Sequence, residues 1–128
     1  MPKIYLSPST QDWNMYVTGS GSEEYNMNLL ADALVPYLLS NGIQYQRNRP
    51  EMTAGSSIRE ANQGEYHLYL ALHSNAAPEG RYGEERGIIA FYYPGSVGGQ
   101  RAAELIAQEL RKIYPLPNKV TTRPTTPL

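Results

Sequence analysis

The stretch His67–Gly80, "HLYLALHSNAAPEG", decides how the chain is expected to fold. The run Tyr66–His73 is apolar at most positions, so the strand that it predicts alternates poorly between its two faces. A strand with two apolar faces is typical of the centre of a parallel sheet that helices cover on both sides. This strand ends in His73, Ser74 and Asn75, which places an imidazole at its carboxyl end.

Strand and helix patterns alternate on both sides of this stretch. Short β-branched and aromatic runs predict three more strands, at Lys3–Ser7, Ile43–Asn48 and Gly87–Tyr93. Helical spacing predicts helices from the Ser22 cap to Asn41-Gly42, at Gly55–Gly64 and at Gly99–Ile113. A kink or break is expected near Val35, before Pro36, and the tail after Leu116 allows one more short strand. The order predicts an α/β fold, a three-layer sandwich with a mostly parallel sheet flanked by helices, in a single domain spanning residues 1–128.

The two long helices are expected to bury apolar stripes. The stripe of the first helix consists of Met27, Leu30, Ala31, Leu34 and Leu38. That of the last helix consists of Ala102, Leu105, Ile106, Leu110 and Ile113. Each set recurs at the spacing that puts residues on one face of an α-helix.

The composition narrows the class of protein. The 128 residues carry a formal net charge of -1, and Lys and Arg are scattered along the chain, so no attraction to nucleic acid or anionic lipid is predicted. There is no cysteine, which excludes thiolate metal sites and leaves metal binding to His, Asp, Glu and amide oxygens. The opening "MPKIYLSPST" has no long apolar run, so neither a signal peptide nor a membrane span is predicted.

Several polar side chains are expected at one edge of the sheet. Ligands gather beyond the carboxyl ends of parallel strands, where Ser7, Asn48 and His73 should lie, and Glu24 in the first turn of the first helix is expected nearby. His67, at the other end of its strand, is expected to be structural. A His and a Glu that converge on a cleft supply the donors of a catalytic zinc site. The alternative is a structural His73 and a surface Glu24 that stabilises the helix dipole.

Two motifs give the chain a specific resemblance. "LHSNA" (Leu72–Ala76) after an apolar strand resembles the "IHxNA" motif of zinc-dependent N-acetylmuramoyl-L-alanine amidases, and "EYNMN" places Glu24 four residues before Asn28, as in that family. "IYLSPS", "YRNRPEMT" and "GIIAFYYPGS" resemble further segments in the same order, so the match covers nearly the whole chain. The resemblance implies a peptidoglycan hydrolase that cleaves the amide bond between N-acetylmuramic acid and L-alanine of the stem peptide. It also implies zinc as cofactor, with His73 and Glu24 among its ligands.

The chain departs from the family pattern in two places. The third zinc ligand of the family is a His in a "DPGHGG"-type turn, where this chain has "SPSTQ" at positions 7–11. We expect Gln11 to be the third ligand, with Asp12 and Asn14 as alternatives, and the other possibility is a site that holds zinc weakly or not at all. The catalytic Glu of the family lies on a late strand in a "VExGF"-like motif, which this chain does not contain. We therefore expect the family's C-terminal part to be missing, the catalytic residue to be unknown, and hydrolysis by this chain to be slow.

Other residues are expected to contact the substrate. Asn75 and Arg49 are predicted to bind it, since a muropeptide carries several carboxylates that an arginine can hold. A solvated surface arginine is the alternative for Arg49. Trp13, Tyr92 and Tyr93 are explained equally well as platforms for a glycan or as packing residues.

Two functions agree with these residues, a hydrolase and an inactive peptidoglycan-binding module on the same fold. With either function, the expected partner is peptidoglycan or a muropeptide, and the expected place of action is the bacterial cell wall. The protein is expected to be a monomer, without a nucleic-acid partner and without a membrane span. The hydrolase is expected to serve as an endolysin or an autolysin. Phage lysis, sporulation and wall turnover stay open as settings.

Overall fold

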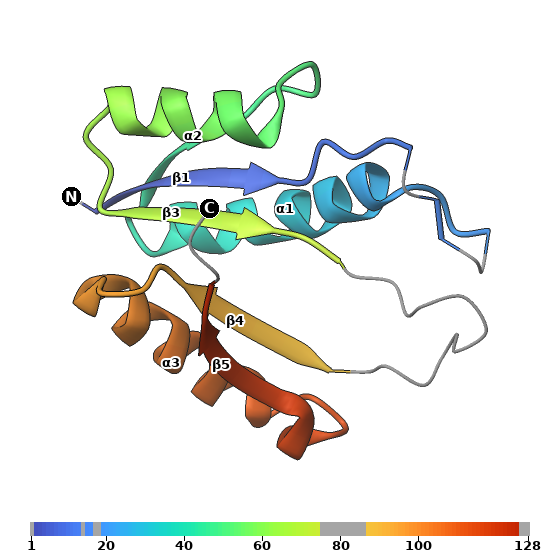
Figure 1. Ribbon diagram of the computed structural model, residues 1–128, viewed down its shortest axis with the longest axis vertical. Coiled ribbons are helices and arrows are strands. Elements are labelled where there is room, and N and C mark those ends of the chain that lie inside the picture. The colour runs from blue at the N-terminus through green and yellow to red at the C-terminus, as the bar shows by residue number, and fades with distance from the viewer. Residues whose placement is uncertain (1, 14, 17–18, 75–86, 126–128) are drawn as a thin grey trace. The chain divides into compact units, whose positions relative to one another are not determined.

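The computed structural model describes residues 2–13, 15–16, 19–74 and 87–125. The chain divides into two compact units, Met1–Ala76 and Ala77–Leu128, and each unit is described by itself (Figure 1). Each unit contains a parallel sheet with helices packed on it, so the α/β class with parallel sheets flanked by helices is confirmed. A single domain of residues 1–128 stays a prediction.

The first unit is built on a three-stranded parallel sheet with the order β2-β1-β3. Its strands are β1 (Lys3–Pro8), β2 (Gln44–Arg47) and β3 (Leu68–Leu72). The middle strand of this sheet is β1, whereas the apolar pattern predicted that β3 would be central. Five of the six β1 residues are buried, although Tyr5 and Ser7 are polar, because hydrogen bonds satisfy their hydroxyls. The apolar run of β3 therefore predicts neither the strand order nor full burial, since the residues of β3 are at most partly buried.

Two helices follow the predicted pattern in the first unit, α1 (Glu23–Ser40) and α2 (Ala54–Gln63). Ser22 caps α1 as predicted, since its side chain accepts a hydrogen bond from the backbone N–H of Tyr25 at 3.0 Å. The predicted break is wrong, because α1 runs through Pro36 as one helix. Leu34 and Leu38 on either side of Pro36 pack on the core, which offsets the hydrogen bond that a proline cannot donate.

The two faces of the first sheet are covered by different helices. Side chains alternate along β1, so Ile4 and Leu6 point to one face while Tyr5 and Ser7 point to the other. Ile4 and Leu6 pack against Ala31 and Leu38 of α1. On the other face, the Tyr5 hydroxyl donates a hydrogen bond to Glu60 of α2, at 3.1 Å. Helix, sheet and helix therefore form three layers in this unit.

The second unit pairs β4 (Ile88–Tyr92) with β5 (Val120–Pro124) in parallel, and Ile88 stands opposite Val120. The connection runs through α3 (Val97–Arg111) and the short 3-10 helix η1 (Pro117–Lys119), and β5 is the further strand that the tail allowed. Gly87 has a φ of +137° just before β4, and a Cβ built there would lie 2.5 Å from the Lys119 carbonyl oxygen. Only glycine fits this approach between the two strands.

The face that α3 turns to its sheet differs from the predicted stripe. Ala103 and Ala107 are buried, while Leu105, Ile106 and Ile113, which were predicted to be buried, are exposed. The small side chains of Ala103 and Ala107 allow the helix to approach β4 and β5 closely. The helix therefore turns this alanine face to the sheet, and not the predicted face with leucine and isoleucine. In α1 the same correction applies to Leu30, which is half exposed.

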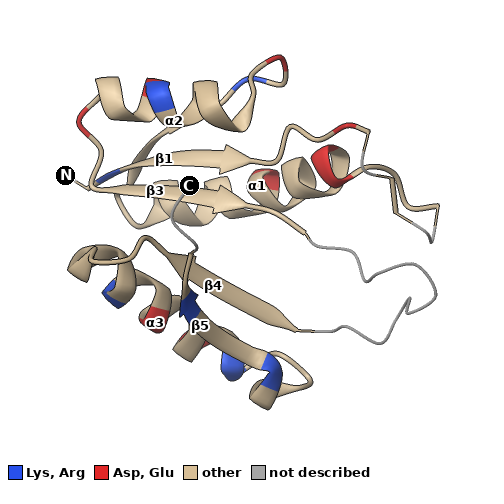
Figure 2. Ribbon diagram, in the orientation of Figure 1, with Lys and Arg blue, Asp and Glu red and all other residues tan. Residues whose placement is uncertain are grey.

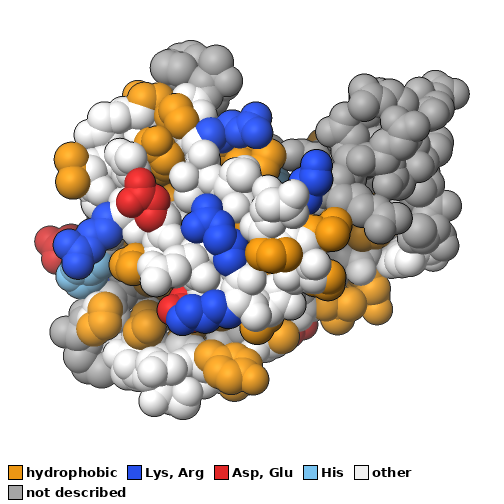
Figure 3. Space-filling view, turned by 90° about the horizontal axis from the view of Figure 1, so that it is seen from below, with side chains coloured by type: hydrophobic (Ala, Val, Ile, Leu, Met, Phe, Trp, Pro, Cys, Tyr) orange, Lys and Arg blue, Asp and Glu red, His pale blue; other side chains and the backbone are white. Residues whose placement is uncertain are grey.

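Charged side chains are spread over both units. Figure 2 shows Lys, Arg, Asp and Glu on helices and loops of each unit. On the face drawn in Figure 3, Lys and Arg side chains are separated by other side chains, and hydrophobic side chains lie between them. Within the part of the chain that the structure describes, no helix has the length and apolar character needed to cross a membrane.

Candidate functional site

A cleft of about 510 Å³ lies at the carboxyl edge of the first sheet. The loop after β1 forms one wall with residues 7–13, and the segment after β2 forms another with Asn48 and residues 50–54. His73, directly after β3, completes the lining. The cleft therefore occupies the place where open parallel sheets bind their ligands, as the strand pattern predicted.

His73 meets a buried carboxylate in this region. Its Nδ1 lies 3.1 Å from Oε2 of Glu23, the first residue of α1. The Glu23 side chain is only 2% exposed, whereas that of His73 is 44% exposed. A carboxylate removed from water needs a polar partner, and the imidazole supplies one. The pair thus joins the end of β3 to the start of α1.

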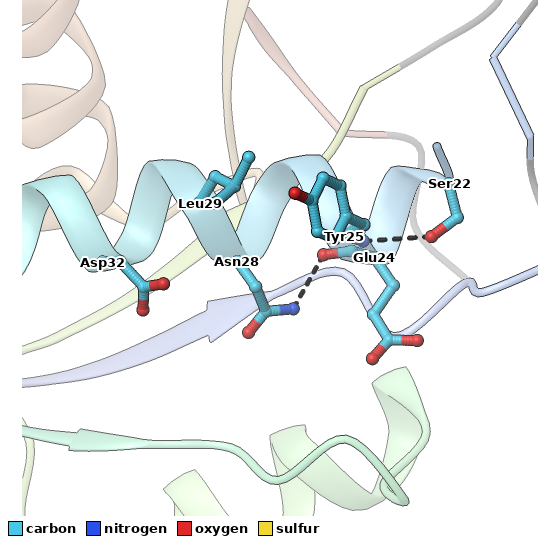
Figure 4. A pocket seen from close by; sticks show the side chains of 6 residues that line it. All are labelled: Ser22, Glu24, Tyr25, Asn28, Leu29 and Asp32. Carbon is cyan, nitrogen blue, oxygen red and sulfur yellow. Dashed lines mark hydrogen bonds between the residues drawn. The ribbon is translucent and has the colours of Figure 1, made fainter. Parts of the chain in front are cut away.

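The residue that converges with His73 is Glu23, where the sequence pattern favoured its neighbour Glu24. Glu24 lines a separate pocket of about 270 Å³ on α1, together with residues such as Asn28 and Asp32. Figure 4 shows the Glu24 carboxylate extending from the helix, with no dashed line reaching it. Among the described residues, Glu24 forms hydrogen bonds through its backbone, since its carbonyl accepts from Asn28 Nδ2 at 2.8 Å and its N–H donates to the Gln11 carbonyl at 3.3 Å. A metal-ligand role for Glu24 stays a prediction.

Helix geometry alone does not separate Glu23 from Glu24. At about 100° per residue, Glu24 lies about 20° from Ala31 and about 40° from Leu38 around the helix axis. Glu23 lies about 80° and about 60° from the same two residues. The motif "EYNMN" selects Glu24 by its distance from Asn28, and the sequence carries no separate signal for Glu23, which is buried and pairs with His73.

Gln11, the predicted third ligand, lines the same cleft as His73, and so does its alternative Asp12. The backbone carbonyl of Gln11 accepts a hydrogen bond from Glu24 N at 3.3 Å, which ties this loop to the start of α1. Asn14, the other alternative, lies outside the described residues. The imidazole and carboxylate of His73 and Glu23 are donors that suit zinc. However, the described residues contain no group of three or more His, Cys, Asp or Glu side chains that could hold a metal, so this pair supplies two donors of the three that catalytic zinc sites use.

The predicted substrate residues have different positions. Asn75 lies outside the described residues. Arg49 is half exposed and forms ion pairs with Glu51 at 3.0 Å and Glu60 at 3.1 Å. These contacts raise the pKa of Arg49, and the hydrogen bond to Glu60 contributes most to the increase. A substrate carboxylate would have to compete with these two acids for the guanidinium, so a substrate role for Arg49 stays a prediction.

Sequence reasoning placed Ser7 and Asn48 at this edge, but it missed the network that they form. Asn48 Nδ2 lies 3.2 Å from Ser7 Oγ, 3.1 Å from the Pro8 carbonyl oxygen and 3.2 Å from Ser57 Oγ of α2. The Tyr69 hydroxyl donates to Ser7 Oγ at 2.9 Å. These bonds tie the ends of β1 and β2 to α2 directly beneath the cleft.

At the opposite edge, His67 has the structural position that was predicted. Its Nδ1 accepts a hydrogen bond from the Lys3 N–H at 3.0 Å, and its own N–H donates to the Lys3 carbonyl at 2.8 Å. The amino ends of β1 and β3 are joined in this way, away from the cleft.

Comparison with known proteins supports the architecture. The chain superposes on the solved structure of the N-acetylmuramoyl-L-alanine amidase AmiC2 of Nostoc punctiforme with a TM-score of 0.74, over 97% of this chain and 69% of that one. The chain shares the fold of that protein. Sequence identity over the superposed part is 13%, so the likeness is one of fold. No protein-family model matches the chain, and no curated protein matches it by sequence.

Proposed function

We propose that this chain is a peptidoglycan hydrolase domain that cleaves the amide bond between N-acetylmuramic acid and L-alanine of the stem peptide. The observation that carries the proposal is the pair His73–Glu23, which lies beside a cleft at the carboxyl edge of the sheet. The amidase fold of the superposed structure supports it. The substrate is then the bacterial cell wall, and one copy of the chain is sufficient to form the cleft.

The reaction adds water across an amide. The water oxygen bonds to the lactyl carbonyl carbon, the C–N bond breaks, and the nitrogen leaves with a proton as the free amine of L-alanine. The contact brings His73 Nδ1 and Glu23 Oε2 within 3.1 Å of each other, so these two atoms could serve as ligands of one metal ion. The buried carboxylate also favours a metal ion at the imidazole, since it lies next to the ring and is held out of water.

Zinc is the cofactor that this donor chemistry fits. When bound, zinc polarises the scissile carbonyl and activates a water molecule. His73 and Glu23 would hold it, with the third ligand drawn from Gln11 or Asp12 on the wall of the same cleft. Glu24 is the alternative carboxylate, because it stands next to Glu23 at the start of α1.

The proposal is tested by incubating the zinc-loaded chain with a muropeptide and measuring release of a peptide with a new N-terminal L-alanine by mass spectrometry. The expected result is slow release that disappears in His73→Ala. We expect slow turnover because no described residue is assigned as general base, and such a base contributes about 10²–10⁴ in rate. Binding of the muropeptide without any release would identify a peptidoglycan-binding module. Release that His73→Ala leaves unchanged would refute the assigned site.

A further inference from the structure

Trp13 stands at the mouth of the cleft with most of its ring in solvent. It is the single tryptophan of the chain, it is 73% exposed, and it lines the cleft wall. Within the described ranges, neither its ring nor its indole N–H has a hydrogen bond or an aromatic or cation–π contact. Tryptophan has the largest apolar face of any side chain, so this surface is available to a ligand in the cleft.

The residues before Trp13 offer polar groups beside that ring. Thr10, Gln11 and Asp12 line the same wall, and none of their side chains forms a hydrogen bond with another described residue. Their backbone is nevertheless held, because Gln11 N donates to Ser9 Oγ at 3.2 Å and Asp12 N donates to the Thr10 carbonyl at 3.0 Å. A fixed backbone with a hydroxyl, an amide and a carboxylate suits a ligand that carries several hydroxyl groups.

The charged residues that line the cleft favour an uncharged part of the ligand at this wall. No Lys or Arg is among its described lining residues, whereas Asp12 and Glu51 are. Arg49 lies between the lining residues Asn48 and Pro50 in the sequence, and it already forms ion pairs with Glu51 and Glu60. An acidic wall disfavours the carboxylates of a stem peptide and accepts the hydroxyl and N–H donors of a sugar.

We propose that Trp13 is a stacking platform for a neutral N-acetylhexosamine ring, and that Thr10 holds its polar groups together with whichever of Gln11 and Asp12 does not bind zinc. This inference rests on the proposed function and assigns the glycan part of peptidoglycan to one wall of the cleft. The C–H bonds on one face of a pyranose ring form an apolar surface that matches the indole face, while the ring's edge carries hydroxyls. A cleft of about 510 Å³ lies within the range of small-molecule sites.

The test uses Trp13 as its own probe, because no second tryptophan contributes to the fluorescence of the chain. The chain is titrated with the uncharged disaccharide GlcNAc–GlcNAc, because MurNAc without its peptide carries a free lactyl carboxylate, and separately with the peptide L-Ala–D-isoGlu–L-Lys without sugar. A saturable change of the emission with the disaccharide, and none with the peptide, is the expected result. A saturable change with the peptide alone would overturn the assignment, and so would no change with the disaccharide.

Calorimetry with three variants separates stacking from a general disturbance of the fold. Trp13→Ala should weaken disaccharide binding roughly tenfold, which corresponds to about 1.4 kcal/mol, while Trp13→Phe should retain most of the affinity. Tyr37→Ala is the matched control, since Tyr37 is an equally exposed aromatic residue of α1 that lines neither pocket. Equal affinity of Trp13→Ala and Tyr37→Ala would overturn the inference.

The outcome is independent of the hydrolysis assay. If the disaccharide binds at Trp13 but no amide is cleaved, the platform stands and the hydrolase proposal fails. If amide cleavage depends on His73 but Trp13→Ala changes neither the disaccharide affinity nor the KM for a muropeptide, the hydrolase stands and the platform fails.

Discussion

The two faces of the first sheet hold the unit together by different means. Beneath α1, Ile4 and Leu6 pack against Ala31 and Leu38 in an apolar cluster. Beneath α2, the same strand presents Tyr5 and Ser7, and the contacts are hydrogen bonds and ring contacts.

The polar face extends to the cleft, and the apolar face does not. Ser7 and Asn48 belong both to the hydrogen-bond network and to the lining of the cleft. Hydrogen bonds have directions, so this face fixes the positions of strand ends and side chains, whereas apolar burial contributes stability without specifying direction. Stability and site geometry therefore depend on opposite faces of β1.

Leu6→Ala is expected to have the largest effect on stability. Leu6 is fully buried in the apolar cluster, and removing its side chain leaves a cavity that costs about 2–5 kcal/mol of unfolding free energy. Chemical denaturation measures this loss. Leu39→Ala, on the exposed side of α1, is the control and should stay within about 0.5 kcal/mol. A similar loss in both variants would show that the apolar face does not dominate stability.

Asn48→Ala is expected to cost less, about 1–3 kcal/mol, because it removes the donor shared by Ser7, Pro8 and Ser57. Its effect on the cleft should exceed its effect on stability, so muropeptide KM should rise more than it does for Leu6→Ala at a temperature where both variants are folded. Gln46→Ala, an exposed polar residue of β2, is the control and should be neutral. If Asn48→Ala leaves KM unchanged, the polar face has no role in shaping the cleft.

Tyr5→Phe tests the polar face through pH. Burial, with the hydrogen bond and charge of Glu60, raises the pKa of Tyr5 to about 12 from its usual 10. The unfolded chain therefore releases this proton first, so the stabilising contribution is present below pH 10 and is lost as pH rises from 10 towards 12. Tyr5→Phe should cost about 1 kcal/mol at pH 8 and show a shallower fall of stability above pH 10. An unchanged slope of unfolding free energy against pH would mean that Tyr5 does not cause this pH dependence. Tyr37→Phe, which changes an exposed tyrosine, is the control.

The sequence predicted the order and type of the three α-helices and of β1 to β4, because the period of apolar residues depends on local geometry, and it allowed β5 but did not predict η1. It also placed Ser7, Asn48 and His73 at one edge, since strand ends follow from strand assignments. The side-chain partners were harder to predict. Which hydroxyl meets Asn48 depends on the register of three elements, and that register is set by tertiary packing.

The predictions of strand order and of the buried helix faces were wrong for a related reason. An apolar pattern does not measure burial directly, because the apolar β3 is only partly buried, while a buried Tyr5 or Ser7 whose hydroxyl is hydrogen-bonded looks polar in the sequence. In α3, alanine residues face the sheet where leucine residues were predicted to do so. The space between the helix and the strands decides which side-chain size fits, and a sequence pattern does not contain that information.

The smallest effect on stability is expected for Glu24→Gln, which extends the comparison to the two sides of α1. Glu24 contributes a favourable charge at the helix start, so its neutral isostere should cost only a few tenths of a kcal/mol. Glu23 lies on the sheet side of the same turn, buried against His73, and Glu23→Gln removes the carboxylate from that contact. Zinc binding, measured by calorimetry and metal analysis, should therefore be weakened at least tenfold in Glu23→Gln and only slightly in Glu24→Gln, because removing a metal ligand or its supporting partner costs about 10–100-fold in affinity. The opposite ranking would restore Glu24 as the ligand that its spacing from Asn28 favours, and Glu23 would then serve to hold His73 in place. Equal zinc affinity in both variants and the parent chain would remove the start of α1 from the metal site altogether.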